Sequence, residues 1–175
     1  MLCKTCRYKY LTPRIHRRRI CDDFEVLSFY DYHEIEDLLL CKHYYIGHKI
    51  YSILGQIALQ SFATALNLHS AVIPIDDKID SYYSHTAILA QKMKTKTLKP
   101  KYNKLIAQNS VRYAGMSLEF RKANPRNFLY KGKKEDIILV DDIVTTGFTM
   151  KEAYEVCKKT GASPLFGVVL ADAKS

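Results

Sequence analysis

Two adjacent carboxylates, Asp141 and Asp142, follow a run of apolar residues and precede a loop rich in hydroxyl groups. Residues 136–140, which contain this apolar run, are predicted to form a buried strand, and a helix is expected to begin at Thr149. The free backbone N–H groups and the dipole of a helix N-terminus favour the binding of phosphate. In open α/β sheets, ligands bind at the carboxyl ends of the strands. The sequence therefore predicts a phosphate site with two acids beside it.

A simpler interpretation of the same residues needs no ligand. Thr149 and Glu152 have the T-x-x-E spacing of a capping box, so Thr149 could serve only as a helix cap. Asp141 and Asp142 could be ordinary turn residues at the end of a strand. Such turns rarely combine a phosphate-binding loop with two acids at the end of a parallel strand, so we favour the phosphate site.

The elements that must position these residues form a βαβ unit. After the strand at 136–140, the pattern predicts a helix over 149–160 and a second strand over 165–171. Gly161 suits the left-handed end of that helix. Upstream, the pattern predicts further strands and helices at 26–30, 34–40, 50–66, 71–75 and 84–94. Alternating strands and helices indicate an α/β fold with a parallel sheet flanked by helices.

The loop at 141–149 contains neither G-x-G-x-x-G nor G-x-x-x-x-G-K-[ST], so dinucleotide and Walker-type sites lose their usual support. It resembles the signature of type I phosphoribosyltransferases. The resemblance implies that Asp141 and Asp142 receive the ribose hydroxyls of phosphoribosyl pyrophosphate with the help of Mg²⁺. It also implies that the following loop holds the 5′-phosphate through Thr145, Thr146, Gly147, Phe148 and Thr149.

The same resemblance places the pyrophosphate loop after an earlier strand, where Asp76, Asp77 and Lys78 follow Ile75. Purine enzymes of the hypoxanthine type carry an Asp as the proton-transfer partner of the base at the position of Thr145. That group is absent, so salvage of such a base is less favoured, whereas sugar-phosphate binding is unaffected.

A wider resemblance covers most of the chain. Cys3-x-x-Cys6, the loop near residue 145, and the stretch Ser117-Leu118-x-x-Arg121-x-x-Asn124-x-x-x-Phe128 together resemble the ComF family of competence proteins, closest to the short forms in Helicobacter and Campylobacter. One departure is the segment 81–86, which stands where many relatives have R-G-F-N-Q. The resemblance implies a cytoplasmic role in handling transforming DNA, with DNA-uptake or recombination proteins as partners and an association with the inner membrane as an option.

Cys3, Cys6 and Cys21 resemble the zinc ribbon of that family, which implies a structural Zn²⁺. A structural zinc site has four ligands, and His16, Asp22 or Asp23 could supply the fourth. Three free thiols on a basic arm are the alternative. A change in composition after residue 24 predicts a zinc-finger-like segment over 1–24 and a phosphoribosyltransferase-like domain over 25–175.

The net charge of +9 comes from two segments, 1–20 and 81–118, each with seven basic residues and no acid. Such an asymmetry favours a polyanionic partner. Tyrosines interleave with these cations and could stack on unpaired bases, which is typical of single-stranded DNA binding. The candidate DNA contacts are Arg17, Arg18, Arg19, Lys94, Lys96, Lys99 and Lys101. A solvated basic surface or attraction to anionic lipid remains the alternative.

An odd number of cysteines, five, and the lack of a signal segment argue against a secreted disulfide scaffold. The longest apolar stretch, 50–66, is interrupted by polar residues, so no transmembrane segment is expected and we expect a cytoplasmic protein. Two functions remain open: a DNA-handling protein with a sugar-phosphate site, and an active phosphoribosyltransferase with an unknown acceptor. A domain that senses the metabolite without turnover is a third option.

Overall fold

The computed structural model describes residues 9–21, 23–76, 83–109 and 117–174. Its main feature is a six-stranded sheet in the order β1-β2-β10-β8-β4-β5. All neighbouring strands run parallel except β1 and β2, which form an antiparallel hairpin. The strands of this sheet are β1 His16–Cys21, β2 Phe24–Ser28, β4 Ser70–Pro74, β5 Leu98–Pro100, β8 Asp136–Val140 and β10 Ser163–Val168.

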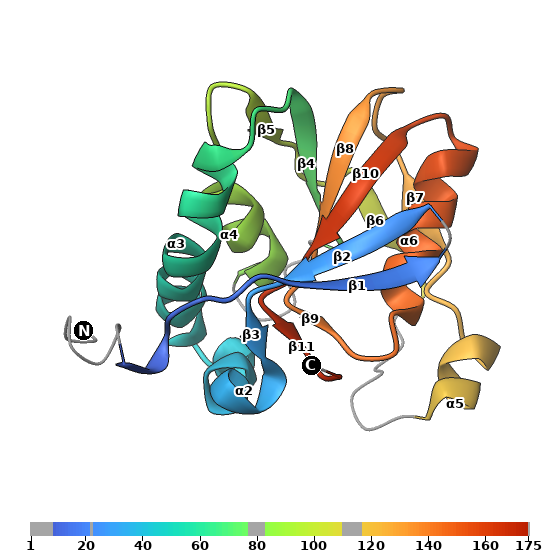
Figure 1. Cartoon of the computed structure of the whole chain (residues 1–175). Coiled ribbons are helices and arrows are strands. Elements are labelled where there is room, and N and C mark those ends of the chain that lie inside the picture. The colour runs from blue at the N-terminus through green and yellow to red at the C-terminus, as the bar shows by residue number, and fades with distance from the viewer. Residues whose placement is uncertain (1–8, 22, 77–82, 110–116, 175) are drawn as a thin grey trace.

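Helices cover both faces of the sheet (Figure 1), and the expected α/β class with a mainly parallel sheet is confirmed. Helices α3 and α4 lie on one face, and α6 lies on the other. The described helices are α2 Tyr32–Leu40, the 3₁₀ turn η1 Cys41–His43, α3 Gly47–Ala65, α4 His85–Lys92, α5 Leu118–Ala123 and α6 Phe148–Lys159.

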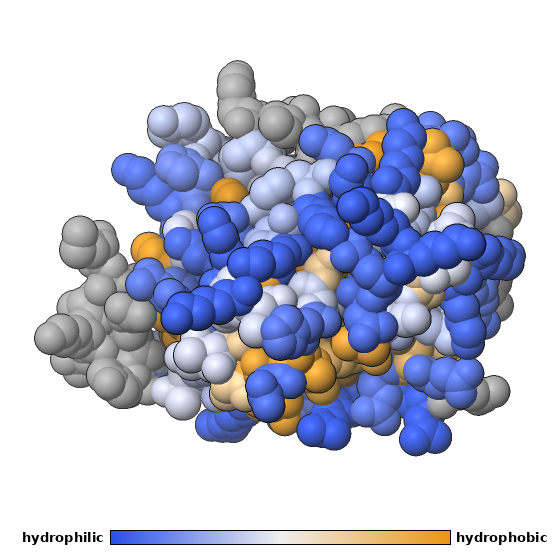
Figure 2. All heavy atoms as spheres, turned by 90° about the horizontal axis from the view of Figure 1, so that it is seen from above, coloured by the Kyte–Doolittle hydropathy of each residue, from blue (hydrophilic) through white to orange (hydrophobic). Residues whose placement is uncertain are grey.

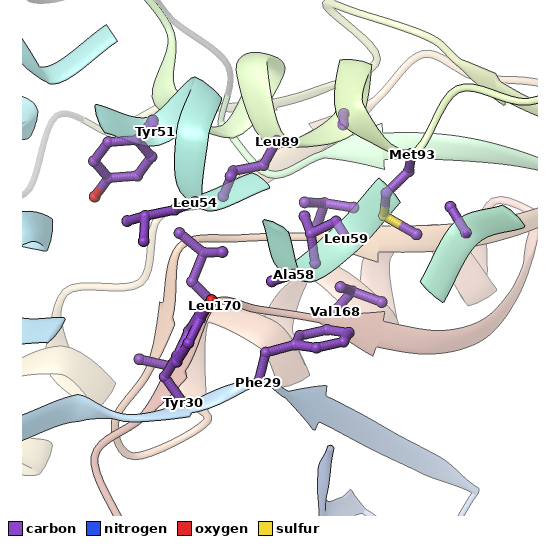
Figure 3. Packing of buried hydrophobic residues seen from close by; sticks show 14 of the residues in the cluster. Phe29, Tyr30, Tyr51, Leu54, Ala58, Leu59, Leu89, Met93, Val168 and Leu170 are labelled. Carbon is purple, nitrogen blue, oxygen red and sulfur yellow. The ribbon is translucent and has the colours of Figure 1, made fainter. Parts of the chain in front are cut away.

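Strand β8 shows why its sequence is a continuous apolar run. Alternate side chains of a strand point to opposite faces, and here both faces are covered. Ile138 and Val140 pack in the cluster that contains α3 and α4, whereas Ile137 and Leu139 pack in the cluster that contains α6. Figure 3 shows the first cluster, where Leu54, Leu59 and Leu89 from the two helices meet Val168 and Leu170.

Short strands extend the carboxyl end of the main sheet. β3 Tyr30–Asp31, β11 Ala171–Asp172 and β9 Ile143–Val144 form a parallel three-stranded sheet in the order β3-β11-β9. An antiparallel ribbon of β6 Leu105–Ala107 and β7 Phe128–Tyr130 lies against the α6 face of the main sheet. The small sheet holds both chain segments that follow β8 and β10.

Helix α6 begins differently from the prediction. Its N-cap is Gly147, with φ of 81°, and no side chain caps the helix. The capping box is therefore wrong, because Thr149 lies inside the first turn. The Glu152 carboxylate instead accepts hydrogen bonds from the backbone N–H groups of Arg126 (3.2 Å) and Asn127 (2.7 Å). Gly161, with φ of 89°, follows the helix as predicted.

The predicted parallel βαβ unit is confirmed by β8, α6 and β10. The predicted strand at 165–171 is divided between β10 and β11, and that at 26–30 between β2 and β3. The expected division of the chain after residue 24 falls at the β1–β2 hairpin, because Cys21 pairs with Phe24. Within the described ranges, no helix combines the length and the apolar character needed to span a membrane.

Candidate functional site

Asp141 and Asp142 lie at the carboxyl end of β8, where the main sheet passes into the small sheet. The Asp141 N–H donates to the Val168 carbonyl (3.0 Å), and the Asp142 carbonyl accepts from the N–H groups of Leu170 (3.0 Å) and Ala171 (3.2 Å). These bonds fix the backbone of both acids between β8 and the segment after β10. The two carboxylates are therefore held on rigid structure.

The loop after the two acids forms a small hollow of about 20 Å³. Its lining residues are Asp141, Ile143, Val144, Thr145, Thr146, Gly147, Phe148, Thr149 and Met150. Asp141 lines this hollow, whereas Asp142 is not among the lining residues. The Phe148 N–H donates to the Thr146 hydroxyl (3.3 Å) at the first turn of α6. The structure thus brings together Asp141 and all five predicted phosphate-loop residues.

Two features of position 147 favour glycine. Its φ of 81° lies in the left-handed region, which L side chains rarely adopt. A Cβ there would also lie 2.8 Å from Cδ1 of Ile20 on β1. The turn that starts α6 therefore lies close to Ile20 of the N-terminal hairpin.

Arg18, predicted as a DNA contact, lies against this loop. Its Nη1 donates to the Thr145 carbonyl (2.8 Å) and to the Asp172 carboxylate (2.8 Å), and only 20% of its side chain is exposed. Arg17 and Arg19, its neighbours on β1, are exposed. Alternation along the strand explains the difference, because successive side chains point to opposite faces. Arg18 is thus bound within the protein.

Asp142 is buried, with 4% of its surface exposed, and is surrounded by polar partners from three other segments. Its Oδ2 accepts from Nζ of Lys42 (2.8 Å) and from the Tyr51 hydroxyl (3.0 Å). Nε2 of His85 lies 3.6 Å from the same oxygen. Lys42 comes from the turn after α2, Tyr51 from α3 and His85 from the first position of α4.

The two neighbouring acids have pKa values displaced in opposite directions. Burial and the adjacent Asp142 carboxylate raise the pKa of Asp141 well above its ordinary value. Burial also acts to raise the pKa of Asp142, but Lys42 and His85 outweigh it and hold that pKa below its ordinary value. The Asp142 charge in turn raises the pKa of Lys42. Burial lowers the pKa of His85, which opposes the effect of Asp142. Asp142 and Lys42 therefore form a charged pair.

The donor set allows a test of whether Mg²⁺ fits. His85, Asp141 and Asp142 have donor atoms within 4.8 Å of one another. Mg²⁺ prefers oxygen ligands and commonly binds through one or two carboxylates plus substrate phosphates. Asp141 fits that role, since it lines the hollow of the loop. Asp142 already has a cation, Lys42, on one oxygen.

Asp76, the one described residue of the predicted pyrophosphate loop, is bound within the protein. Its carboxylate accepts from Nη1 of Arg126 (2.9 Å) and from the N–H of Ala107 (3.1 Å). The charge of Arg126 also acts to lower the pKa of Asp141, so Arg126 is close to Asp141 as well as to Asp76. Asp77 and Lys78 lie outside the described residues. Arg126 and Asp76 thus form an ion pair at this end of the sheet.

The predicted DNA contacts on the lysine-rich segment divide into two kinds. Lys94, Lys96 and Lys99 are exposed, on the turn between α4 and β5 and on β5 itself. Lys101 instead pairs with Glu135, at 2.7 Å. Hydrophilic side chains cover most of the face that lies at the top of Figure 1, where this turn is found (Figure 2). Three of the four lysines are therefore accessible to a polyanion.

Of the predicted zinc ligands, the structure describes only Cys21, a half-buried free thiol on β1. Cys3, Cys6 and the alternative ligand Asp22 lie outside the described residues. His16 and Cys21 stand at opposite ends of β1, about 17 Å apart at the rise of a strand, so they cannot share one ion. Asp23 remains as an alternative, with its carboxylate 3.3 Å from Lys158.

Sequence reasoning did not assign five residues to this site: Arg18, Lys42, Tyr51, His85 and Arg126. Lys42, Tyr51 and Arg126 carry no local signal, and the basic segment of Arg18 indicated a different ligand, DNA. His85 had one usable signal. It follows the N-cap Ser84 on the helix after β4, and the carboxyl end of β4 lies beside that of β8.

Solved structures that are similar to this one include three phosphoribosyltransferases. Orotate phosphoribosyltransferase from Aeropyrum pernix is 20% identical, with 71% of this chain and 60% of that chain covered and a TM-score of 0.44. Adenine phosphoribosyltransferase from Trypanosoma brucei is 11% identical, with 91% and 87% covered and a TM-score of 0.48. Hypoxanthine phosphoribosyltransferase from Staphylococcus aureus is 14% identical, with 71% and 64% covered and a TM-score of 0.44. With TM-scores below 0.5, these likenesses carry no argument on activity or substrate.

Among curated proteins, a transcriptional regulator named GfcR from Methanosphaera stadtmanae is 48% identical over 42 residues. The match covers 24% of this chain and 21% of the regulator, so it spans about a fifth of that protein's length. No family model matches the chain.

Proposed function

We propose that this protein binds phosphoribosyl pyrophosphate, or a related 5-phosphoribosyl compound, in the loop between β8 and α6. One observation carries the proposal. A carboxylate at the end of a buried parallel strand, Asp141, lines the same hollow as a left-handed glycine and a helix N-terminus. Backbone N–H groups at such a terminus suit a phosphate, and a carboxylate beside them suits the hydroxyls of the attached ribose.

Mg²⁺ fits the proposal as a partner of the ligand. Bound with the pyrophosphate, it would supply positive charge to the leaving group. In this chain Asp141 would hold it, and the ion pair of Arg126 with Asp76 lies at the same end of the sheet. Asp142 would keep Asp141 in place through the backbone that the two residues share.

Transfer of the phosphoribosyl group to a base or amine is the alternative within the same site. The bond from C1′ to the pyrophosphate would break as a bond to the acceptor forms, through an oxocarbenium-like state that nearby carboxylates stabilise. Thr145 cannot serve as the general base that an Asp supplies in hypoxanthine-type enzymes. Product formation from phosphoribosyl pyrophosphate with a candidate base would favour the transferase.

Isothermal titration calorimetry with phosphoribosyl pyrophosphate in Mg²⁺ tests the binding site. We expect Asp141→Asn to weaken binding by about 1.5–3 kcal/mol for each charged hydrogen bond removed, which is roughly 10- to 100-fold in Kd. Asp136→Asn is the matched control, since Asp136 is exposed at the opposite end of the same strand. Equal affinity of the Asp141 variant and the wild type would remove Asp141 from the site.

A second function, binding of single-stranded DNA during DNA uptake, is favoured by a separate observation. Arg17, Arg19, Lys94, Lys96 and Lys99 are exposed. The resemblance to ComF proteins supports a cytoplasmic role of this kind, with DNA-uptake or recombination proteins as partners and a zinc-binding N-terminal segment. Fluorescence anisotropy of a labelled oligothymidylate over a salt series tests it. Saturable binding near physiological salt supports this function, and its absence shifts the weight to the transferase.

A further inference from the structure

The turn that carries Lys42 is held firmly against the site. The hydroxyl of Tyr83, just before α4, donates to the Lys42 carbonyl (2.9 Å). The N–H of Tyr44 donates to the Cys41 carbonyl (3.0 Å), and that of Gly47 to the Tyr44 carbonyl (2.9 Å). A Cβ on Gly47 would overlap the Cys41 carbonyl and the Tyr83 hydroxyl. The backbone of Lys42 is therefore tied to the segment before α4 and lies in a hydrogen-bonded turn.

The side chain of Lys42 completes a set of partners around a single oxygen. Asp142 Oδ2 receives the Lys42 ammonium at 2.8 Å and the Tyr51 hydroxyl at 3.0 Å, with Nε2 of His85 at 3.6 Å. The Tyr51 hydroxyl, which shares its one proton between Asp142 and the Leu39 carbonyl at 3.2 Å, belongs to a fully buried residue. Only 28% of the Lys42 side chain is exposed, so its ammonium is largely withdrawn from water.

Charge balance indicates what this arrangement does. Two adjacent carboxylates beside an imidazole would together attract a divalent cation, because their charges repel and their donor atoms converge. Lys42 neutralises the Asp142 carboxylate, and its ammonium occupies a position at Oδ2 that a metal ion would need. A single remaining carboxylate binds Mg²⁺ only weakly unless a ligand brings phosphate oxygens with it.

We propose that Lys42 is the resident cation of this site and excludes divalent metal from Asp142 in the free protein. Asp142 is then a positioning residue. It anchors the chain after β8, so that the neighbouring Asp141 faces the loop. A divalent metal binds this site only together with a phosphate ligand, and its protein ligand is Asp141. The first part of the proposal concerns the free protein, so it can fail or succeed independently of whether phosphoribosyl pyrophosphate is the ligand.

The test is a titration of the free protein with Mn²⁺, a substitute for Mg²⁺ that electron paramagnetic resonance detects directly. We expect Lys42→Met to bind one Mn²⁺ at least about tenfold more tightly than the wild type, because it exposes a site of two uncompensated carboxylates. Lys42→Arg, which keeps the cation, should resemble the wild type. Lys49→Met is the matched control, since Lys49 is exposed in the first turn of α3, a few residues after Lys42.

Two results would overturn the proposal. One is a folded Lys42→Met protein with no gain in Mn²⁺ affinity. The other is that the free wild-type protein binds one Mn²⁺ and the Asp142→Asn variant does not. The second measurement needs no variant of Lys42, so it can overturn the proposal even if Lys42→Met fails to fold. Circular dichroism of each variant establishes whether it has folded.

Discussion

Asp141 and Asp142 are neighbours in the chain, but their side chains lie in different environments. Asp141 lines the hollow of the loop, and Asp142 is bound by Lys42 and Tyr51. The two carboxylates nevertheless have donor atoms within 4.8 Å of each other, so the charge of Asp142 acts on Asp141. Burial and like charge raise the pKa of Asp141, whereas the nearby cations lower that of Asp142. One acid is thus a candidate ligand contact and the other a fixed internal charge.

The raised pKa of Asp141 predicts an effect on stability. At pH values between its ordinary pKa of 3.8 and the raised value, the folded protein retains a proton that the unfolded chain has released. The free energy of unfolding should therefore fall as pH rises through this interval. Asp141→Asn should remove that fall and leave the protein more stable than wild type at neutral pH. Urea unfolding at several pH values above 3.8 measures it.

Asp136→Asn serves again as the control, because Asp136 is exposed on the same strand. The control should keep the wild-type dependence of stability on pH. If Asp141→Asn showed the same decline with pH as the control, the carboxyl group of Asp141 would not be the source of it.

At the residue scale, a sequence can indicate a candidate site only where its residues are local. The two acids and the loop that follows them are contiguous, so their types and spacing can be read directly. Lys42 and Tyr51 reach Asp142 from positions 100 and 91 residues away in the chain, and only the packing of α3 and its preceding turn on the sheet brings them there. No local pattern encodes such a meeting.

The central element is the turn from β8 through the loop into α6. Its conformation depends on Gly147 rather than on a capping side chain, and Ile20 of β1 packs where a Cβ would lie. The sequence correctly predicted that a helix follows this loop, since apolar periodicity is strong there. It wrongly predicted the cap, because the spacing of Thr149 and Glu152 also suits a glutamate that binds the backbone of a distant loop.

Gly147→Ala should reduce both stability and phosphate binding. A left-handed conformation costs an L residue about 1–2 kcal/mol, and the contact with Ile20 adds to that cost. Relief of the strain would move the loop N–H groups. We expect a lower Tm in thermal unfolding and a weaker titration with ribose 5-phosphate.

Gly161→Ala is the matched control for this change. Gly161 has a similar φ of 89°, but its Cβ would meet only the flexible side chain of Lys134, far from the loop along α6. The control should lower Tm while leaving the affinity for ribose 5-phosphate unchanged. An equal loss of affinity in both variants would mean that the effect arises from general destabilisation.

For the whole molecule, the fold reduces the basic charge that is available to a partner. Sequence reasoning assigns seven cations to the candidate DNA surface, but Arg18 is bound to Asp172 and Lys101 to Glu135. The two acid-free segments of the sequence find their acids in other parts of the chain. The sequence alone therefore overestimates the positive charge that is available to DNA. It does not show which of the seven cations form ion pairs with distant acids in the folded protein.

Replacing Lys94, Lys96 and Lys99 together by Ala should flatten the salt dependence of oligothymidylate binding by about 0.7 for each phosphate that the protein no longer neutralises. Lys101→Ala is the control, since Lys101 is paired with Glu135 and should change the slope less than any of the other three lysines. Anisotropy titrations at several salt concentrations give the slopes. An unchanged slope in the triple variant would place the DNA-binding surface elsewhere.

The sheet order has a consequence for synthesis of the chain. The β1–β2 hairpin leaves the ribosome before β10, the sheet neighbour of β2, and the partner of Arg18, Asp172, is 154 residues further along the chain. At ordinary translation rates that delay is on the order of 10 s. During this interval the hairpin presents an unpaired strand edge, which other chains could join. Nascent chains that stall before β10 should therefore depend on chaperones to keep this edge covered.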